Sequence, residues 1–306
     1  MANKNKLLLV DGSALIHRAY HAMPELSDAQ GNQIGAVYGV ARMLVRAIQD
    51  LEPTHVVVAL DRPEPTFRKE LFIGYQANRP ASDEKLIEQF GKIRELLAAM
   101  KMVVLDKAGF EADDVIGTLC VRAVESNQFE SVVVVTGDKD LMQLVNDKVS
   151  LYMPVRGMSE TEVVDQDRVR ERLGIRSDQV VDYKALVGDG SDNYPGVYGI
   201  GPKTAIDLLA KYDKYFDIWN HLKELPENLV SKLEKGREGG DLSYTLATIK
   251  KDVEIEIEWR KAMINQNLGS YSEVLRNFGL KSLANQLIEV KVLDELKTDQ
   301  IGLFEG

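Results

Sequence analysis

Four short apolar runs, each ending at or just before an aspartate, constrain the fold most strongly. They are "KLLLVD" (6–11), "THVVVALD" (54–61), "MKMVVLD" (100–106) and "SVVVVTGD" (131–138). Each run has the length and the β-branched content of a buried strand. Amphipathic helical patterns lie between them, at 35–51 and at 83–100, and Ser82 is the expected N-cap of the second. Strands that alternate with helices predict an α/β fold with a mostly parallel central sheet flanked by helices.

The acidic residues near these runs are expected to meet at one edge of the sheet, because the carboxyl ends of parallel strands lie together and ligands bind there. Asp11, Asp61 and Asp138 follow three of the strands. Glu111, Asp113 and Asp114 open the helix that comes after the remaining strand, 100–106. Acids in the first turn of a helix also interact favourably with the helix dipole, which could account for one or two of them.

Three further acids, Asp140, Asp189 and Asp192, bring the group to nine. Two carboxylates about 4 Å apart repel by about 4 kcal/mol at an effective dielectric near 20, so a fold that gathers them needs a compensating charge. Nine acids are too many for a pair that shares one proton, whereas Mg²⁺ prefers oxygen ligands. We therefore expect a site for two metal ions of the kind that cleaves phosphodiesters.

The net charge of −10 argues at face value against a nucleic-acid partner. The nine acids supply most of that charge, and two divalent ions would return about four positive charges. The single cysteine, Cys120, excludes an internal disulfide and is expected in the core. The four histidines are scattered along the chain and predict no catalytic constellation. Without a signal-peptide pattern or an apolar stretch of about 20 residues, we expect a soluble, cytoplasmic protein with no membrane partner.

After about residue 175, short helical patterns replace the strands. We predict an α/β domain over residues 1–174, a helical domain over 175–290 and a flexible tail over 291–306. In the helical domain, "GIGPKTA" is a glycine-rich segment that opens a helix, where backbone N–H groups can bind a phosphate and Lys203 can add a charge. The loop between its glycines is too short for a nucleotide-binding P-loop. A packing loop between two helices would explain the same glycines without a ligand.

Together these segments resemble the bacterial 5′-nuclease, or flap endonuclease, family, which includes the 5′–3′ exonuclease domain of DNA polymerase I and free-standing relatives. The matching segments run in family order over about residues 5–290: "LLLVDGSALIHRAYHA", "VVVALD", "FRKELFIGYQANRP", "GFEADDVIGTL", "VVTGDKDLMQLV", "YKALVGDGSDNYPGVYGIGPKTA" and "LRNFGLKSL".

The resemblance implies hydrolysis of phosphodiesters near the 5′ ends of DNA flaps, nicks and gaps in replication and repair, with two Mg²⁺ or Mn²⁺ ions. It assigns one metal group to Asp11, Asp61, Glu111, Asp113 and Asp114, and a second to Asp138, Asp140, Asp189 and Asp192. It makes residues 67–83 a helical arch over the single-stranded 5′ end. It also implies a helix–hairpin–helix element that grips duplex DNA and often holds K⁺, here formed by Gly196, Gly199, Ile200, Gly201, Lys203 and Thr204.

One arch position departs from the family pattern. The family commonly has Tyr-Lys-x-x-Arg, in which the lysine helps the scissile phosphate to react. The segment "YQANR" keeps Tyr75 and Arg79 but has Gln76 in place of the lysine. Glutamine donates hydrogen bonds but carries no charge. Our hypothesis is that Gln76 weakens stabilisation of the transition state and that Arg79 or Arg68 partly compensates; alternatively, Arg79 carries this role and Gln76 is neutral.

The tail segment "QIGLF" resembles a short bacterial motif that binds the sliding clamp, through Gln300, Ile301, Leu303 and Phe304. The alternative is a tail that folds back onto the body. A polymerase domain would continue beyond residue 306, so we expect a free-standing nuclease, with a DNA polymerase as a further candidate partner.

Two other functions compete with the nuclease: a protein that binds DNA structures with weakened catalysis, suggested by Gln76, and an RNA nuclease of the PIN type. The complete set of acids argues against the first, and the helical domain with "GIGPKTA" argues against the second.

Overall fold

The computed structural model describes residues 5–287, apart from residues 25, 29, 80–82, 157–159 and 266. At its centre is a six-stranded sheet in the order β3-β2-β1-β4-β5-β6. Every neighbouring pair is parallel except β5 and β6, so the predicted mostly parallel sheet is confirmed. The strands are β1 (Lys6–Asp11), β2 (His55–Ala59), β3 (Val103–Leu105), β4 (Ser131–Val135), β5 (Val149–Arg156) and β6 (Glu160–Val164).

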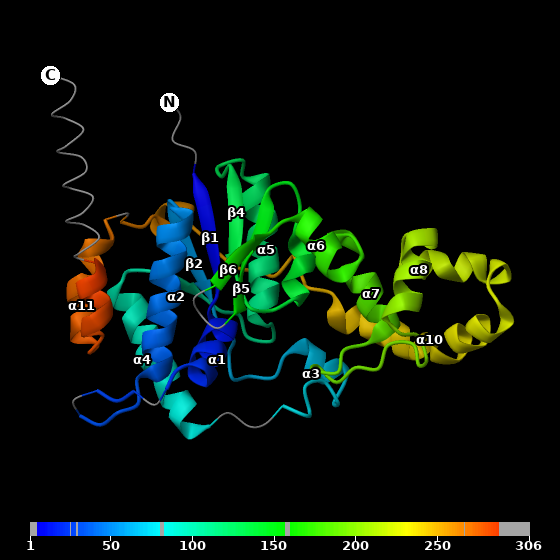
Figure 1. Ribbon diagram of the computed structural model, residues 1–306, viewed down its shortest axis with the longest axis horizontal. Coiled ribbons are helices and arrows are strands. Elements are labelled where there is room, and N and C mark those ends of the chain that lie inside the picture. The colour runs from blue at the N-terminus through cyan, green and yellow to red at the C-terminus, as the bar shows by residue number, and fades with distance from the viewer. Residues whose placement is uncertain are drawn as a thin grey trace, which may run out of the picture.

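Helices cover both faces of this sheet (Figure 1). Alternate side chains of a strand point to opposite faces. Leu7 and Leu9 of β1 accordingly belong to the core beneath α5, whereas Leu8 and Val10 belong to the core beneath α1 and α2. The helices of these two layers are α1 (Gly12–Ala22), α2 (Gly35–Leu51), α4 (Glu84–Ala99) and α11 (Ser272–Asn277) on one face and α5 (Ala112–Glu125) on the other.

Two local expectations were wrong or incomplete. The cap of α4 is Asp83, whose carboxylate accepts a hydrogen bond from the Lys85 N–H at 3.0 Å, and Ser82 lies outside the described residues. Strands β5 and β6 were not anticipated. Pro154 interrupts the pattern of β5 next to an irregularity in the pairing, and β6 is a half-exposed edge strand without a continuous apolar run.

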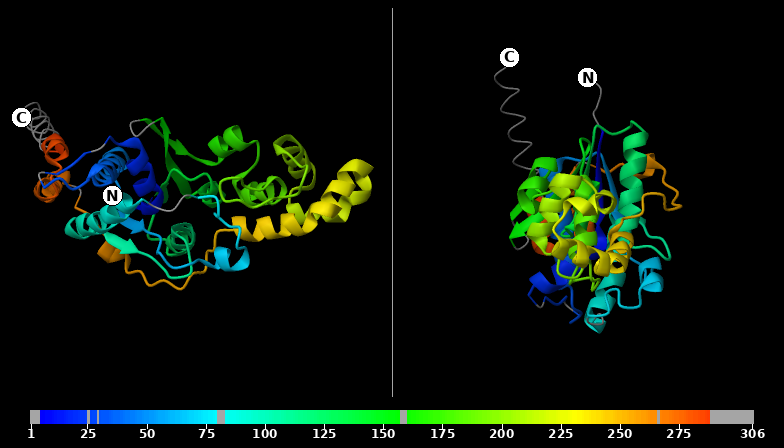
Figure 2. Two further views of the ribbon diagram at one scale, coloured as in Figure 1. Left: turned by 90° about the horizontal axis from the view of Figure 1, so that it is seen from below. Right: turned by 90° about the vertical axis from the view of Figure 1, so that its right-hand side faces the viewer.

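The helical part of the chain lies at one end of the sheet (Figures 1 and 2). Its elements are α6 (Gln166–Leu173), η2 (Ser177–Gln179), α7 (Val180–Val187), α8 (Pro202–Tyr212), α9 (Tyr215–Ile218), η3 (Trp219–Glu224) and α10 (Glu227–Ala247), where η denotes a 3₁₀ helix. Within the described residues, no helix is both long and apolar enough to cross a membrane.

Helix α10 is one continuous element of 21 residues, although several glycines interrupt its helical pattern. These glycines permit close packing rather than a break in the helix. A Cβ atom added to Gly239 would lie 2.6 Å from the carbonyl oxygen of Gly196, and one added to Gly240 would lie 2.4 Å from the Tyr215 hydroxyl. Because only glycine allows such an approach, α10 packs directly against the loop that precedes α8.

After α10 the chain returns along α5 to the far end of the sheet. The backbone N–H of Val253 donates to the Thr118 hydroxyl at 3.1 Å, and Arg122 donates to the carbonyls of Val253 and Ile255. The remaining elements are α3 (Phe67–Leu71), η1 (Asp140–Leu144), η4 (Trp259–Ala262) and η5 (Leu268–Tyr271). The return segment ties the helical part of the chain to the layer that carries the acids.

Candidate metal centre and nucleic-acid cleft

A cleft of about 680 Å³ lies where β1, β2 and β4 end. Seven of the nine predicted acids line it: Asp11, Asp61, Glu111, Asp113, Asp138, Asp140 and Asp192. This is the point at which the chain order reverses across the sheet, since β2 lies on one side of β1 and β4 on the other. Ligands of open α/β sheets bind at such switch points.

The acids at the strand ends are held by backbone and hydroxyl groups of neighbouring elements. Asp11 is buried, and its two oxygens accept hydrogen bonds from the Ala14 N–H at 3.0 Å and from the Thr136 hydroxyl at 2.7 Å. Asp61 accepts the N–H of Ala112, the first residue of α5, at 2.7 Å. Hydrogen bonds of this kind fix the carboxylate orientations before any ligand binds.

The two neighbouring acids in the first turn of α5 have different surroundings. Asp113 lines the cleft. Asp114 is fully buried and accepts two hydrogen bonds from Arg68, at 2.7 and 2.9 Å, and one from the Lys250 N–H at 2.8 Å. Arg68 is itself buried and also donates to Glu111 at 2.9 Å. We infer that Asp114 and Arg68 position α5 and Glu111, whereas Asp113 faces the ligand.

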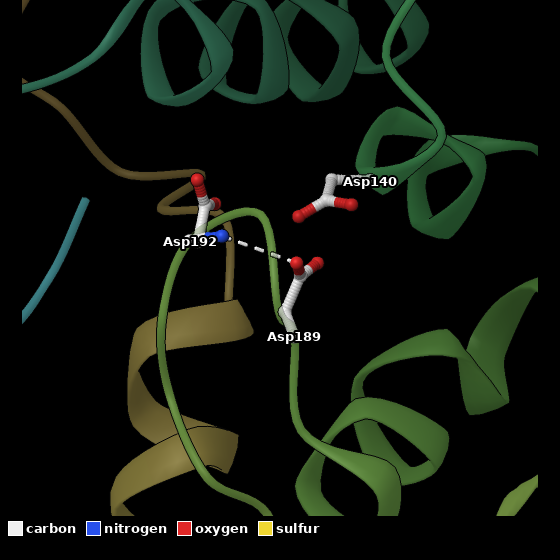
Figure 3. A group of neighbouring side chains, drawn as sticks. All are labelled: Asp140, Asp189 and Asp192. Carbon is white, nitrogen blue, oxygen red and sulfur yellow. Dashed lines mark hydrogen bonds between the residues drawn. The ribbon is translucent and has the colours of Figure 1, made fainter. Parts of the chain in front are cut away.

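Three of the four acids predicted for the second metal ion, Asp140, Asp189 and Asp192, form a compact cluster, here called the second acidic group (Figure 3). Carboxylate oxygens of Asp140, Asp189 and Asp192 lie within 4.8 Å of one another, and the Asp192 N–H donates to Asp189 at 3.2 Å. Arg79 donates to Asp192 at 2.6 Å. The ammonium of Lys184 pairs with Asp140 and with Asp189. These three acids come from η1 and from the loop after α7, so both parts of the chain contribute to one site.

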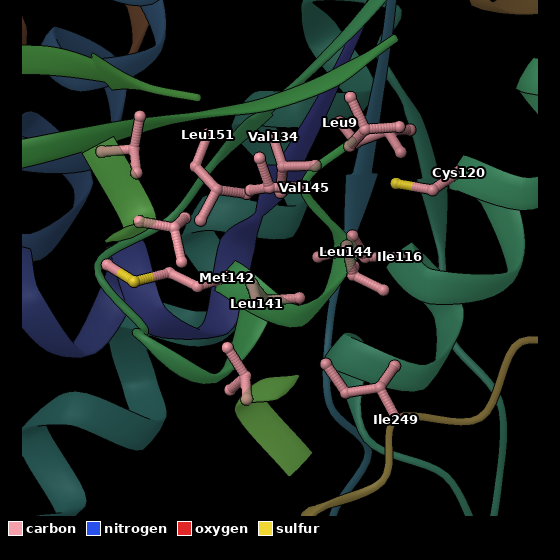
Figure 4. Close-up of a cluster of buried hydrophobic side chains, with 14 of the residues drawn as sticks. Leu9, Ile116, Cys120, Val134, Leu141, Met142, Leu144, Val145, Leu151 and Ile249 are labelled. Carbon is pink, nitrogen blue, oxygen red and sulfur yellow. The ribbon is translucent and has the colours of Figure 1, made fainter. Parts of the chain in front are cut away.

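The short helix η1 is anchored in the apolar core (Figure 4). Its side chains Leu141, Met142 and Leu144 are buried in the cluster that also contains Leu9 and Val134 of the sheet. Burying three large apolar side chains contributes several kcal/mol, at about 1.5–3 kcal/mol each. The core therefore fixes the backbone that carries Asp138 and Asp140 at the edge of the cleft.

Burial and mutual repulsion raise the pKa values of several cleft acids. Burial, with nearby carboxylates, raises the pKa of Asp11, of Glu111 and of Asp140 to about 7. Burial also raises the pKa of Asp113 well above its ordinary value, and Asp138 and Asp11 add to this shift. Oxygen donors that are costly to ionise without a cation fit a hard divalent ion, which would stabilise all of them in the charged form.

These shifts predict how metal and pH act on stability. The unfolded chain binds protons at these acids only below about pH 4, whereas the metal-free folded protein keeps them to about pH 7. Their stabilising contribution is thus present below the unfolded pKa and is lost as the pH rises through the folded pKa. A divalent ion binds the ionised form, so we expect the rise in Tm produced by Mn²⁺ to grow between about pH 5.5 and about pH 8.

This prediction is checked by thermal unfolding in EDTA and in Mn²⁺ at each pH. Burial lowers the pKa of His55, which lies outside the cleft and affects both conditions alike, so the difference reports on the groups that line the cleft. A Mn²⁺ effect on Tm that is constant or declines with pH would contradict the prediction.

The segment after α3 lies against the second acidic group. The Tyr75 hydroxyl is 3.2 Å from Glu111 and 3.3 Å from Asp192. The Gln76 N–H donates to the carbonyl of Asp192 at 2.9 Å, with Gln76 in the left-handed backbone region at φ 55°. Gln76 and Arg79 both line the cleft. Residues 67–79 of the predicted arch therefore reach the acids, while 80–82 lie outside the described residues.

The predicted hairpin before α8 is a tight loop. Gly196 and Gly199 have φ of 64° and 81°, and a Cβ atom at Gly196 would lie 2.2 Å from the backbone nitrogen of Gly188. Ile200 is buried in the core, so it anchors the loop rather than reaching a ligand. Three further predicted DNA contacts are at the start of α8, where Gly201 and Lys203 are exposed and Thr204 is half-buried.

Sequence reasoning missed Lys184 and Thr136 as members of the site. Both stand inside segments that carry the family resemblance, but a lysine in a helix and a threonine after a strand are common everywhere. Only the contacts of Lys184 with Asp140 and Asp189, and of Thr136 with Asp11, reveal them. The candidate clamp motif, residues 300–304, lies outside the described residues.

Two family models cover most of the chain. Residues 6–174 match the 5′–3′ exonuclease N-terminal resolvase-like domain, and residues 175–268 match the 5′–3′ exonuclease C-terminal SAM fold.

Curated relatives agree with these models. The chain is 36% identical over 289 residues to the 5′–3′ exonuclease of Bacillus subtilis, which covers 93% of this chain and 97% of the relative. It is 40% identical over 258 residues to DNA polymerase I of the same organism, which covers 84% of this chain but only 29% of the polymerase.

Among solved structures, the fold is similar to that of the bacteriophage T5 flap endonuclease in a complex with DNA and metal ions. The TM-score is 0.64 at 20% identity, over 94% of this chain and 99% of the phage protein.

Proposed function

The chain belongs to the 5′–3′ exonuclease family, and from this premise we propose that it cleaves phosphodiesters near the 5′ ends of flapped, nicked or gapped DNA with two Mg²⁺ or Mn²⁺ ions. The carrying observation is that seven carboxylates, contributed by both matched domains, line one cleft together with the arch residues Gln76 and Arg79. A shared-proton pair would need two of them, whereas divalent ions can use all seven directly or through water.

We assign one ion to Asp11, Asp61, Glu111 and Asp113 and the other to Asp138, Asp140, Asp189 and Asp192. Bound ions of this kind supply Lewis-acid stabilisation of the scissile phosphate and a more acidic attacking water. Asp114, predicted as a ligand, acts instead through Arg68, because its oxygens already accept hydrogen bonds from Arg68 and two backbone N–H groups.

The arch residues bind and orient the substrate in this proposal. Arg79 is half exposed and carries the positive charge closest to Asp192, so it can move from that carboxylate to a phosphate oxygen as DNA enters. The Tyr75 hydroxyl contacts the carboxylates of both Glu111 and Asp192 and holds them in position relative to each other. Arg68 also lines the cleft, but its guanidinium already donates to two carboxylates and two carbonyls, so we assign it a positioning role rather than that of the missing lysine.

The duplex beyond the cleavage point would contact the hairpin that precedes α8. Exposed backbone N–H groups at a helix start and the charge of Lys203 suit phosphate oxygens without sequence preference. The buried Ile200 keeps this hairpin rigid against the core. We further propose that the hairpin carbonyls bind K⁺, which would appear as a K⁺-dependent rise in duplex affinity over Na⁺ at equal ionic strength.

The central test is cleavage of labelled substrates: 5′-flap DNA, nicked duplex, gapped duplex and single-stranded RNA, each with Mg²⁺, Mn²⁺ or EDTA. We expect cleavage of the DNA substrates that stops in EDTA. Tight flap binding without cleavage would favour a protein that only binds DNA structures, and preferential cleavage of the RNA would overturn the choice of substrate.

Gln76 provides a separate prediction. Replacing it with lysine adds a positive charge in the cleft, where an ammonium can stabilise the charge that develops on a phosphate, so we expect single-turnover cleavage about tenfold faster. Gln76→Met, which removes the hydrogen-bonding group without adding charge, is the matched control. Unchanged cleavage by Gln76→Lys would mean that Arg79 already supplies this charge.

For partners beyond DNA, we propose the bacterial sliding clamp, bound through Gln300, Ile301, Leu303 and Phe304. We also propose a DNA polymerase, whose nicked product would be the substrate of this nuclease. A pull-down with a bacterial clamp tests the first, and a Leu303→Ala plus Phe304→Ala variant that binds equally well would remove it.

A further inference from the structure

The second acidic group already contains a cation from the chain itself. Lys184 stands in α7, five positions before Asp189, and its ammonium donates to that carboxylate at 2.6 Å. The same ammonium pairs with Asp140. It therefore lies between two of the three carboxylates whose oxygens come within 4.8 Å of one another.

The fold holds Lys184 in this position. Its side chain is only 12% exposed, and its ammonium lies 5.9 Å from the ring centroid of Tyr194. Arg79, the other cation of the group, has a side chain that is 54% exposed and comes from a segment at the surface. Arg79 can leave Asp192 because its own side chain reaches solvent, whereas the side chain of Lys184 is buried beside Asp140 and Asp189.

The charges agree with this position. Three carboxylates within 4.8 Å of one another repel, and the ammonium of Lys184 offsets part of that repulsion because it pairs with two of them.

We propose that Lys184 is a resident cation of the second acidic group, which holds Asp140 and Asp189 together in the metal-free protein and competes with a divalent ion for them. This inference rests on the proposed two-metal function. Its consequence is that the two groups differ in affinity. An ion entering the second group has to displace an ammonium shared by two of its carboxylates. In the first group only Glu111 pairs with a cation in the described structure, and that cation, Arg68, is also held by Asp114 outside the cleft.

The test is Mn²⁺ binding to the full chain, measured by calorimetry and by electron paramagnetic resonance of the free ion. In Lys184→Met we expect the weaker of two sites to bind Mn²⁺ at least about tenfold more tightly, because unit charges this close interact strongly even at a protein's effective dielectric. The tighter site, whose carboxylates do not pair with Lys184, should change less than the weaker one. The metal-free Tm should fall, and the rise in Tm on adding Mn²⁺ should become larger.

The matched control is Lys214→Met. Lys214 also pairs with two carboxylates, those of Asp178 at 2.9 Å and Asp182 at 3.5 Å, but outside the cleft, so Mn²⁺ binding should be unchanged. Lys184→Gln is the second variant at the site itself. A variant that folds only with Mn²⁺ supports the proposal, because the ion then replaces the lysine.

Second-site affinity that is unchanged or weaker in a folded Lys184 variant would overturn the proposal, as would variants that stay unfolded in Mn²⁺. The proposed function fails differently: wild-type protein would bind no Mn²⁺ and cut no flap DNA. Two-ion binding with cleavage, but no effect of Lys184, removes only the resident-cation inference.

Discussion

Replacing Asp113 with asparagine is expected to slow cleavage of 5′-flap DNA by about a hundredfold to a thousandfold, a loss typical of removing one charged or polar group that acts on the reacting centre. Asp113 lines the cleft. Burial raises its pKa, and the neighbouring carboxylates of Asp138 and Asp11 raise it further. Asparagine has nearly the same shape but cannot supply the negative charge that a divalent ion needs. Single-turnover cleavage at saturating Mg²⁺ is the measurement.

The same substitution should leave the fold intact. Removing a half-buried acid that other carboxylates repel is expected to keep or raise the metal-free Tm, so lost activity cannot be ascribed to unfolding. Asp167→Asn is the control, since Asp167 is an exposed acid of α6 with the same change in charge. Cleavage by Asp113→Asn within about threefold of wild type would remove Asp113 from the metal site.

Replacing Arg68 with methionine is expected to destabilise the protein by about 3–5 kcal/mol, because it leaves a buried carboxylate without its partner. Arg68 is 3% exposed and donates to Asp114, to Glu111 and to the carbonyls of Leu246 and Thr248. It therefore joins α3, the first turn of α5 and the end of α10. Urea unfolding of the metal-free protein measures the loss.

A surface pair provides the control for this prediction. Arg94 donates to Asp106 at 2.9 Å, but its side chain is 44% exposed, so Arg94→Met should cost about 1 kcal/mol or less. Adding Asp114→Asn to Arg68→Met should recover part of the loss, because the uncompensated charge is then gone. Equal effects of Arg68→Met and Arg94→Met would show that the buried pair does not support the fold.

The local pattern of the sequence was sufficient for the central architecture. Apolar runs of strand length between amphipathic helices predict a parallel sheet, and the strand ends then bring Asp11, Asp61 and Asp138 to one edge. The pattern failed where tertiary packing overrides it. Pro154 and the half-exposed β6 weakened the strand signal, and the glycines of α10 serve close packing against Gly196 rather than a break.

The roles of individual acids depended on the tertiary structure. Asp113 and Asp114 are adjacent in "FEADD", and the sequence by itself determines only that both are acids at a helix start. Consecutive helical side chains point about 100° apart, so one turns toward the cleft and the other toward Arg68, 46 positions earlier in the chain. The position of Lys184 between Asp140 and Asp189 likewise depends on how α7 packs against η1. Local spacing therefore determined which residues gather at the sheet edge, whereas long-range packing decided which of them have a charge partner within the protein and which remain available for a metal ion.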